Sequence, residues 1–413
     1  MKLLKIALSI AAIFVVSAVG AQGVGTVKGS IALVGGTVYI DPVATPIENG
    51  TVLIRDGVIV AVDRQDKVRV PRGTTVIDCA GMTVTAGFWN SHVHFHERKW
   101  FEADKVPAAD LTAQLKDMLT QRGFTSVYDT WSNFGNTTKL RARIESGEVS
   151  GPRIRTTGEA LMHKGGVPQQ MAVDTFGPVE EAEVADAHDA RAATKKLLDS
   201  GVDGIKMYAM TYPQFAMAEE TMAAAVDEAH GRGKLVFAHP TLAAGLLRAV
   251  NAGADVIVHT TPITGPWNDT LLDAMKSKDV SVIPTLKLWR YETRDAPPAL
   301  QRNLTNNGIA QLKAWVGKGG TVLFGTDVGY MLDYDTSEEF KYMADAGMDH
   351  RQMLASLTTA PALRFGDGQR LGKAAVGLIG DLVVLKGNPA QSIDAFTAVE
   401  YTIRDGRVIY QAK

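Results

Sequence analysis

The chain has 413 residues, of which 46% are hydrophobic and 21% are charged, a composition typical of globular proteins with a substantial core. The formal net charge is −2, so charge indicates neither a nucleic-acid partner nor attraction to an anionic membrane. The length exceeds that of an ordinary domain and suits a barrel of about 250 residues with an accessory module.

The N-terminus predicts a secretory signal peptide over residues 1–21. Lys2 and Lys5 precede an apolar run over residues 6–16, and a stretch of small residues ends at Ala21. The apolar run is short for a transmembrane span, although an uncleaved anchor is the alternative. We therefore expect a periplasmic or secreted protein with no membrane association after cleavage. Cys79 is the only cysteine, and we expect it to be buried and inert.

Both ends of the mature chain predict β structure. Residues 30–40 alternate loosely in polarity, and residues 50–62 contain a hairpin signal at Asp56-Gly57. After residue 372 the strand candidates are 380–385, 398–404 and 407–410, with a second turn at Asp405-Gly406. Because neither end has enough strands to fold alone, residues 29–81 and 366–413 are predicted to form one composite β-sandwich.

Residues 82–365 predict an α/β fold, a (β/α)8 TIM barrel, because short apolar strands alternate with amphipathic helices. The predicted strands cover residues 84–92, 126–130, 154–157, 204–207, 235–239, 256–259, 280–284 and 322–327. The predicted helices cover residues 108–122, 180–200, 218–232, 241–252, 269–277, 337–343 and 350–357. The irregular segment 287–306 is expected to form a loop and a short helix over the barrel mouth.

The first barrel strand ends in His92-Val93-His94. Side chains on a strand alternate, so His92 and His94 point to the same side and suit a divalent metal such as zinc. Alternating histidines also occur on exposed strands, so the pair alone leaves both interpretations open. His96 continues the alternation but lies beyond the apolar run, on the expected loop.

Other predicted strand ends carry groups that fit the same site, since the chemistry of a TIM barrel lies at the C-terminal ends of its strands. Lys206 lies on the fourth strand, His239 and His259 end the fifth and sixth, and Asp327 ends the eighth. Each has an ordinary alternative: a surface lysine, a hydrogen-bonded core histidine, or an aspartate that caps a helix. Together they favour a metal centre.

With these motifs the chain resembles the amidohydrolase superfamily of metal-dependent hydrolases, and within it the imidazolonepropionase-like branch that includes Xaa-Pro dipeptidases. The resemblance rests on motifs spread over nearly the whole mature chain: Ala86-Gly87-Phe88, His92-Val93-His94, Lys206, His239, His259, Gly325-Thr326-Asp327, residues 358–362 and residues 380–384.

The resemblance implies two divalent metal ions, with zinc the expected metal, and an N6-carboxylated Lys206 that bridges them. His92, His94, the carbamate and Asp327 would hold one ion, and His239, His259 and the second carbamate oxygen the other. A water shared by both ions would attack an amide carbonyl, with Asp327 as general base and then general acid. Tyr208 would donate a hydrogen bond to the developing oxyanion.

The expected reaction is hydrolysis of an amide or peptide bond in a small substrate, which His163, Tyr208 and Tyr330 are expected to contact. A homo-oligomer is left open. One alternative is a mononuclear cyclic amidine hydrolase or deaminase of the same superfamily. Those enzymes carry Glu or Gln three residues after the fifth-strand histidine, where this chain has Leu242. The second alternative, a non-catalytic binding protein, would be expected to have lost ligands, and none is missing.

Overall fold

The structure is a computed structural model that describes residues 29–166, 175–177, 181–210 and 215–413. The predicted signal peptide over residues 1–21 lies outside the described residues. Within the described ranges, no helix is both long and apolar enough to cross a membrane.

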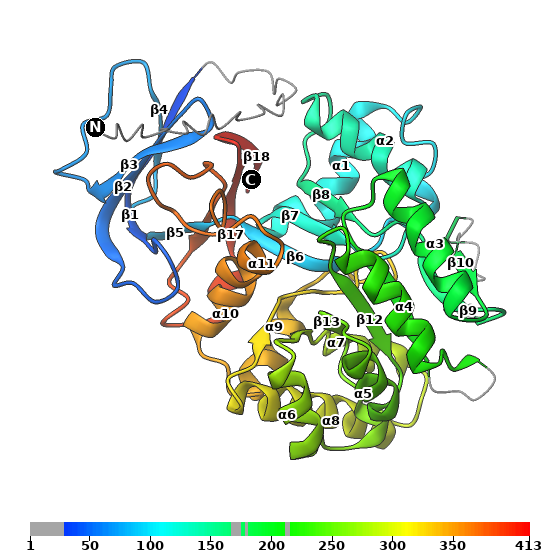
Figure 1. Cartoon of the computed structure of the whole chain (residues 1–413). Coiled ribbons are helices and arrows are strands. Elements are labelled where there is room, and N and C mark those ends of the chain that lie inside the picture. The colour runs from blue at the N-terminus through cyan, green and yellow to red at the C-terminus, as the bar shows by residue number, and fades with distance from the viewer. Residues whose placement is uncertain (1–28, 167–174, 178–180, 211–214) are drawn as a thin grey trace, which may run out of the picture.

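An eight-stranded sheet joins strands from both ends of the chain (Figure 1). Its path is β18-β17-β16-β5-β1-β2-β3, and β4 pairs with β1. The strands are β1 (Ser30–Val38), β2 (Ile47–Arg55), β3 (Val58–Arg64), β4 (Thr75–Asp78), β5 (Met82–Ala86), β16 (Leu382–Lys386), β17 (Val399–Arg404) and β18 (Arg407–Gln411). The predicted association of the two ends is therefore present as one continuous sheet. A sandwich of two sheets is not confirmed.

Two Asp-Gly turns bring the two ends of the chain together. Asp56 and Gly57 have φ values of 50° and 81°, and Asp405 and Gly406 have values of 50° and 70°, as two-residue hairpin turns with positive φ require. The Gly380 N–H donates to the Gly57 carbonyl at 2.7 Å, and the Gly406 N–H donates to the Gly380 carbonyl at 3.0 Å. Both predicted hairpin turns are thus present, and they share a backbone hydrogen-bond network.

The central region contains two parallel sheets covered by helices (Figure 1). One sheet has the order β6-β7-β8, and the other has the order β10-β9-β11-β12-β13-β14-β15. The strands are β6 (Phe88–Val93), β7 (Phe124–Asp129), β8 (Arg153–Thr156), β9 (Ala160–His163), β10 (Glu181–Val184), β11 (Ile205–Ala209), β12 (Val236–Pro240), β13 (Val256–Val258), β14 (Ser281–Ile283) and β15 (Thr321–Val322). The helices are α1 (Ala108–Met118), α2 (Phe134–Glu145), α3 (Ala187–Ser200), α4 (Glu219–His230), α5 (Ala243–Asn251), α6 (Asp269–Ser277), α7 (Lys287–Glu292), α8 (Pro298–Gly317), α9 (Ser337–Asp345), α10 (His350–Leu357) and α11 (Thr359–Arg364).

The predicted α/β fold with parallel strands is confirmed, but the strands do not form one closed ladder. Backbone hydrogen bonds connect β6 with the segment that follows β15. The Ser91 N–H donates to the Phe324 carbonyl at 2.7 Å, and the Asp327 N–H donates to the His92 carbonyl at 2.9 Å. Across the opposite gap, the ladders of the described residues do not pair β8 with β11. The closed TIM barrel is therefore not confirmed.

The predicted strand 84–92 is divided at Gly87. Residues before Gly87 belong to β5 of the terminal sheet, and residues after it belong to β6. A Cβ atom at Gly87 would lie 2.2 Å from Thr125 Oγ1, so the chain passes too close to β7 for a side chain. The residues on both sides of Gly87 are apolar, so the sequence pattern alone does not show that the chain passes from one sheet to another here.

The predicted helix 180–200 is wrong in its first part. Residues 181–184 form β10, which pairs in parallel with β9, and α3 begins only after Asp186. Asp186 accepts a hydrogen bond from the Asp189 N–H at 3.0 Å, the arrangement of a helix N-cap. The cap marks the true start of the helix.

The expected loop and short helix over residues 287–306 are right only in part: α7 is a short helix, but the 20-residue α8 begins within the segment, so two helices occupy most of it. Pro298 is the first residue of α8, a position that proline favours. The buried stripe of α8 consists of Thr305, Gly308, Gln311, Leu312 and Trp315. Three of these five are polar or lack a side chain, so the stripe does not stand out as amphipathic. The remaining predicted helices of the central region agree with the structure to within four residues at their ends.

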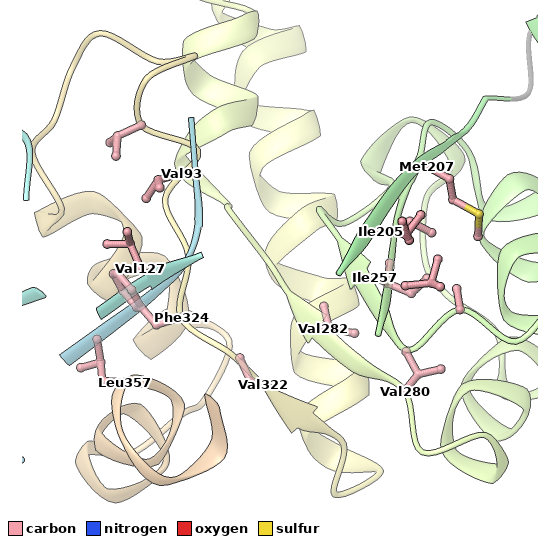
Figure 2. Close-up of a cluster of buried hydrophobic side chains, with 14 of the residues drawn as sticks. Val93, Val127, Ile205, Met207, Ile257, Val280, Val282, Val322, Phe324 and Leu357 are labelled. Atoms are coloured by element: carbon pink, nitrogen blue, oxygen red, sulfur yellow. The ribbon is translucent and has the colours of Figure 1, made fainter. Parts of the chain in front are cut away.

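Strands β12 and β13 separate two apolar layers. Ile205, Met207 and Ile257 belong to the large core cluster between strands and helices, part of which Figure 2 shows. Alternate positions such as Phe237 and Val258 belong to a second cluster on the other face. Side chains alternate along a strand. Lys206, between Ile205 and Met207, and Tyr208, after Met207, therefore face away from the large core cluster, on the side where the candidate site lies.

Candidate metal centre

Asp327 meets His92, on β6, and His94, the residue after β6, in a buried cluster. The Nε2 atoms of His92 and His94 each lie 3.0 Å from the same oxygen, Asp327 Oδ1. One potential ligand atom from each residue lies within 4.8 Å of the others. On its other ring nitrogen, Nδ1, His92 contacts the Thr130 hydroxyl. Both strand ends therefore converge as the sequence predicts.

Hydrogen bonds fix the ring of His94, a member of the cluster, and the ring of His259. His94 Nδ1 lies 2.8 Å from the Trp131 carbonyl oxygen and therefore donates to it. His259 Nδ1 lies 2.6 Å from the Thr285 hydroxyl. Fixing Nδ1 in this way leaves Nε2 with a lone pair, which is how metal-binding histidines are usually oriented.

The predicted second pair of histidines lies beside the first. The ring centroids of His92 and His259 are 5.0 Å apart, and those of His239 and His259 are 4.5 Å apart. Strands β6, β12 and β13 and the segment after β15 thus bring all four predicted histidines and Asp327 into one group.

Lys206 lies in β11 with its side chain completely buried. Its Nζ atom has no hydrogen-bond partner among the described residues, which is unusual for a buried amine. Burial lowers the pKa of Lys206 to about 7, although the negative charges of Asp327 and Asp129 oppose this shift. A large fraction of the amine is therefore uncharged at neutral pH.

The electrostatic state of the cluster suits a divalent cation. Burial lowers the pKa of His92 to about 3 and also holds the pKa values of His239 and His259 well below the usual histidine range. Burial disfavours ionisation of Asp327, but a proton on the facing Nε2 atoms of His92 and His94 outweighs burial and holds the pKa of Asp327 well below the usual range, and a cation in place of that proton would act in the same direction. Neutral imidazoles around an ionised carboxylate form a suitable donor set for zinc or a similar ion.

The backbone is strained around this cluster. Trp131, His259, Thr285 and Asp327 have φ values of 129°, 75°, 44° and 62°, respectively, in the region that favours glycine. Two of the four are predicted ligands, and the other two hydrogen-bond to a ligand imidazole. Such strain persists where surrounding contacts enforce it, commonly at functional sites.

The three predicted substrate contacts lie at different places. Tyr208 stacks on His239, with ring centroids 4.4 Å apart, and is buried. Tyr330 is half-buried, and its hydroxyl donates to Glu292. His163 ends β9 with its Nδ1 atom 3.0 Å from the Lys164 carbonyl. Its neighbour Met162 packs in the cluster that contains Tyr208, so the alternation of the strand turns His163 away from that cluster. Contact of all three with substrate stays a prediction.

Two buried polar residues near the site were not assigned from the sequence. His96 stacks on His94, with ring centroids 4.8 Å apart, and only its alternation with the two preceding histidines signalled it. Asp129 ends β7 and accepts hydrogen bonds from Ser132 at 2.6 Å and Thr156 at 2.8 Å. Burial nevertheless raises the pKa of Asp129 to about 6. Its position at the end of an apolar strand was the available signal.

The model of the amidohydrolase family matches residues 83–409, which include every residue of this cluster. The chain belongs to the amidohydrolase family. The predicted relationship is confirmed, and so is the class of protein, an enzyme of a hydrolase family that acts on amide and peptide bonds. Metal dependence is a property of the family, and the cluster supplies potential ligands.

Individual relatives of this amidohydrolase are distant. Ochratoxinase of Aspergillus niger is 23% identical over 410 residues, covering 88% of this chain and 83% of the relative. A crystal structure of an Xaa-Pro dipeptidase with bound methionine has a TM-score of 0.79 and 24% identity, covering 93% of this chain and 100% of the other. A prolidase structure with bound N-methylphosphonate-L-proline has a TM-score of 0.76 and 27% identity, with the same coverage.

Proposed function

We propose that this amidohydrolase is a binuclear metal-dependent enzyme that hydrolyses amide or peptide bonds in small, dipeptide-like substrates. The observation that carries the proposal is the buried amine of Lys206, which has no hydrogen-bond partner in the described part of the chain and interacts electrostatically with a cluster of four histidines and an aspartate. The dipeptidase and the prolidase among the similar structures support hydrolysis of a peptide bond as the reaction.

The side chains present divide into two ligand sets around Lys206. His92, His94 and Asp327 form one set, since both imidazoles already share one carboxylate oxygen. His239 and His259 form the other set, with adjacent rings. Ions bound there would supply Lewis acidity and an activated water.

Lys206 is proposed to bridge the sets as a carbamate. Its uncharged amine attacks carbon dioxide, an N–C bond forms, one proton leaves, and an anionic group with two oxygens results. The low pKa of the amine favours this reaction. An ammonium group would instead repel nearby cations. A carbamate would offer one oxygen to the ion held by each ligand set.

Asp327 and Tyr208 are the proposed catalytic residues. The ionised Asp327 takes a proton from the attacking water and returns it to the leaving nitrogen. Burial raises the pKa of Tyr208 well above its usual range, so its hydroxyl keeps its proton and can donate to the developing oxyanion. His163 and Tyr330 are proposed as further substrate contacts.

We also propose that the protein is exported and begins near Gln22 after signal cleavage. The basic start, apolar run and small residues of the N-terminus support this. N-terminal sequencing of protein recovered outside the cytoplasm tests it, and an intact Met1 would contradict it.

A hydrolysis screen tests the proposed activity. Purified protein, prepared with zinc, is assayed against dipeptides, N-acyl amino acids and lactones. We expect turnover of at least one amide class, its loss on chelation, and its return on adding metal. Turnover of lactones alone, or of none of the panel by metal-loaded protein, would contradict the proposal.

A further inference from the structure

His96 has a buried ring nitrogen that the proposed metal centre does not explain. The residue is 2% exposed, and its Nε2 atom has no hydrogen-bond partner among the described residues. His92, His94 and Asp327 form the compact ligand group, and His96 is not a member. A buried nitrogen without a partner is unfavourable and calls for a ligand or another role.

The surroundings of His96 are aromatic. Its ring lies parallel to His94, edge-on to Trp131 with centroids 4.9 Å apart, and 6.1 Å from Phe176. Trp131 in turn meets Tyr208 edge-on with centroids 5.3 Å apart. One nitrogen is thus held among rings beside a metal-ligand candidate.

These rings belong to a wider apolar group that runs from the ligands toward the half-buried Tyr330. We call this the aromatic cluster; it comprises Trp131, Ala160, Met162, Phe176 and Tyr208, with Met210 and Tyr330 packed against it. Tyr208 links it to the ligands by stacking on His239. Tyr330 lies parallel to Phe176, with centroids 6.1 Å apart. An apolar substrate group would therefore find aromatic and methionine side chains directly beside the proposed reaction centre.

We propose that His96 is a substrate-binding residue, and that the aromatic cluster selects amides with a large apolar or aromatic side chain next to the scissile bond. Its Nε2 atom would form a hydrogen bond with an uncharged group of the substrate, such as a carbonyl or hydroxyl. A charged group would lose more hydration than one ring nitrogen among aromatic rings can replace. This inference rests on the proposed amide hydrolysis and specifies its substrate class.

The competing explanation is that His96 only supports His94 by stacking. Two substitutions separate these roles. His96→Phe keeps a flat ring against His94 but removes the nitrogen, whereas His96→Asn keeps hydrogen-bonding atoms and removes the ring. His188→Phe is the control, because the side chain of His188 on α3 is 91% exposed.

The experiment measures kcat, KM, metal content and melting temperature of the zinc-loaded full-length mature proteins. The substrates are matched pairs, N-acetylphenylalanine with N-acetylglycine and Phe-Ala with Gly-Ala. For the wild type we expect kcat/KM to be at least about tenfold higher for the aromatic member of a pair. For His96→Phe we expect kcat/KM at least about tenfold lower, mainly through KM, with unchanged metal content. His96→Asn should regain part of the loss, and His188→Phe should match the wild type.

Three results would overturn the inference: no aromatic preference in the wild type, wild-type kinetics in His96→Phe, or loss of metal from His96→Phe. The last would assign His96 to support of the metal centre. Failure of the wild type to hydrolyse any amide would be a different result, because it would contradict the proposed function itself.

Discussion

Asp327 is the residue on which most of the proposed chemistry depends. Its carboxylate contacts two imidazoles through one oxygen, and its backbone is held at a φ of 62°. Asn90, buried on β6, accepts from the Thr326 N–H at 3.2 Å and donates to the Thr326 hydroxyl. The neighbouring strand thus fixes the segment that presents Asp327.

We predict that Asp327→Asn loses activity by at least about 100-fold, as expected for a general acid–base group, while keeping much of its metal. A carboxamide still offers an oxygen ligand but cannot take the proton of the attacking water. Steady-state kinetics and metal analysis measure both effects. Asp273→Asn on α6 is the control, since that side chain is 66% exposed. Activity within a few fold of wild type in Asp327→Asn would show that another group is the base.

The metal-free protein should lose stability as the pH falls below about 6.5. The folded-state pKa values of His92, His239 and His259 lie below the unfolded value, so the unfolded chain binds protons first. Each such histidine contributes a slope of about 1.4 kcal/mol per pH unit below its unfolded pKa. That stabilisation is complete above the unfolded pKa and is lost as the pH falls toward the folded one.

Two buried carboxyls work in the opposite direction. Burial raises the pKa of Asp129 to about 6 and that of Glu339 to about 7, so they stabilise the fold at low pH and lose that contribution as the pH rises through those values. We expect the histidines to outweigh them, with a net loss of at least about 1.4 kcal/mol between pH 6.5 and 5. Urea unfolding of chelator-treated protein measures this. Stability that is constant or rises toward pH 5 would contradict it.

At the scale of elements, the sequence predicts those helices and strands whose apolar residues recur with the period of the element. The hairpin turns and most strands and helices of the central region are predictable because Asp-Gly pairs and apolar periodicity report directly on backbone geometry. Helix α8 is hidden because its buried face includes Gly308 and Gln311. Strand β10 is hidden because four residues carry too little periodicity, and its pairing with β9 is a tertiary contact.

The candidate site follows the same division. His92, His94 and Asp327 are predictable because parallel strand ends converge on one edge, which makes distant residues neighbours. His96 escapes prediction because it follows the apolar run, so nothing in the sequence shows that a loop residue is buried. The closed barrel and the sandwich both depend on strand pairing across the molecule, which local patterns do not specify.

The buried face of helix α8 includes the polar residue Gln311, and the contribution of Gln311 to stability can be tested. Gln311 is completely buried, accepts from the Thr261 N–H at 2.7 Å and donates to the Thr261 carbonyl at 2.9 Å. Gln311→Leu should lower the free energy of unfolding by about 2–4 kcal/mol, because two buried backbone groups lose their partner. Asn306→Leu on the exposed face of the same helix should change it by less than about 0.5 kcal/mol. Chemical denaturation measures both, and equal effects would contradict the role assigned to Gln311.

For the whole molecule, the terminal sheet makes the two ends of the chain interdependent. Strand β16 pairs with β5 over five residue pairs. Arg153 is the first residue of β8. Its guanidinium donates to the Asp381 carboxylate at 2.8 Å and to the Asp405 carboxylate at 3.0 Å. The C-terminal segment therefore contacts both the N-terminal strands and the central α/β region.

We predict that a chain ending near Gly366 aggregates. Removing β16 exposes the edge of β5, and unpaired edges promote association between chains. The apolar face built from Leu382 and Val384 would be lost as well. Size-exclusion chromatography and activity of the truncated protein test this. A soluble, active truncated protein would show that the pairing of the two ends is dispensable.

The most direct test of the proposed binuclear centre is metal stoichiometry in the wild type and in Lys206→Ala. With both proteins purified under the same zinc supply, elemental analysis should give about two ions per wild-type chain. Lys206→Ala should lose the bridge, at least one ion and nearly all activity, and a short carboxylic acid should restore part of both by placing a carboxylate in the vacated space. If Lys206→Ala instead keeps the full wild-type metal content and full activity, Lys206 is a structural residue and the binuclear carbamate centre is wrong.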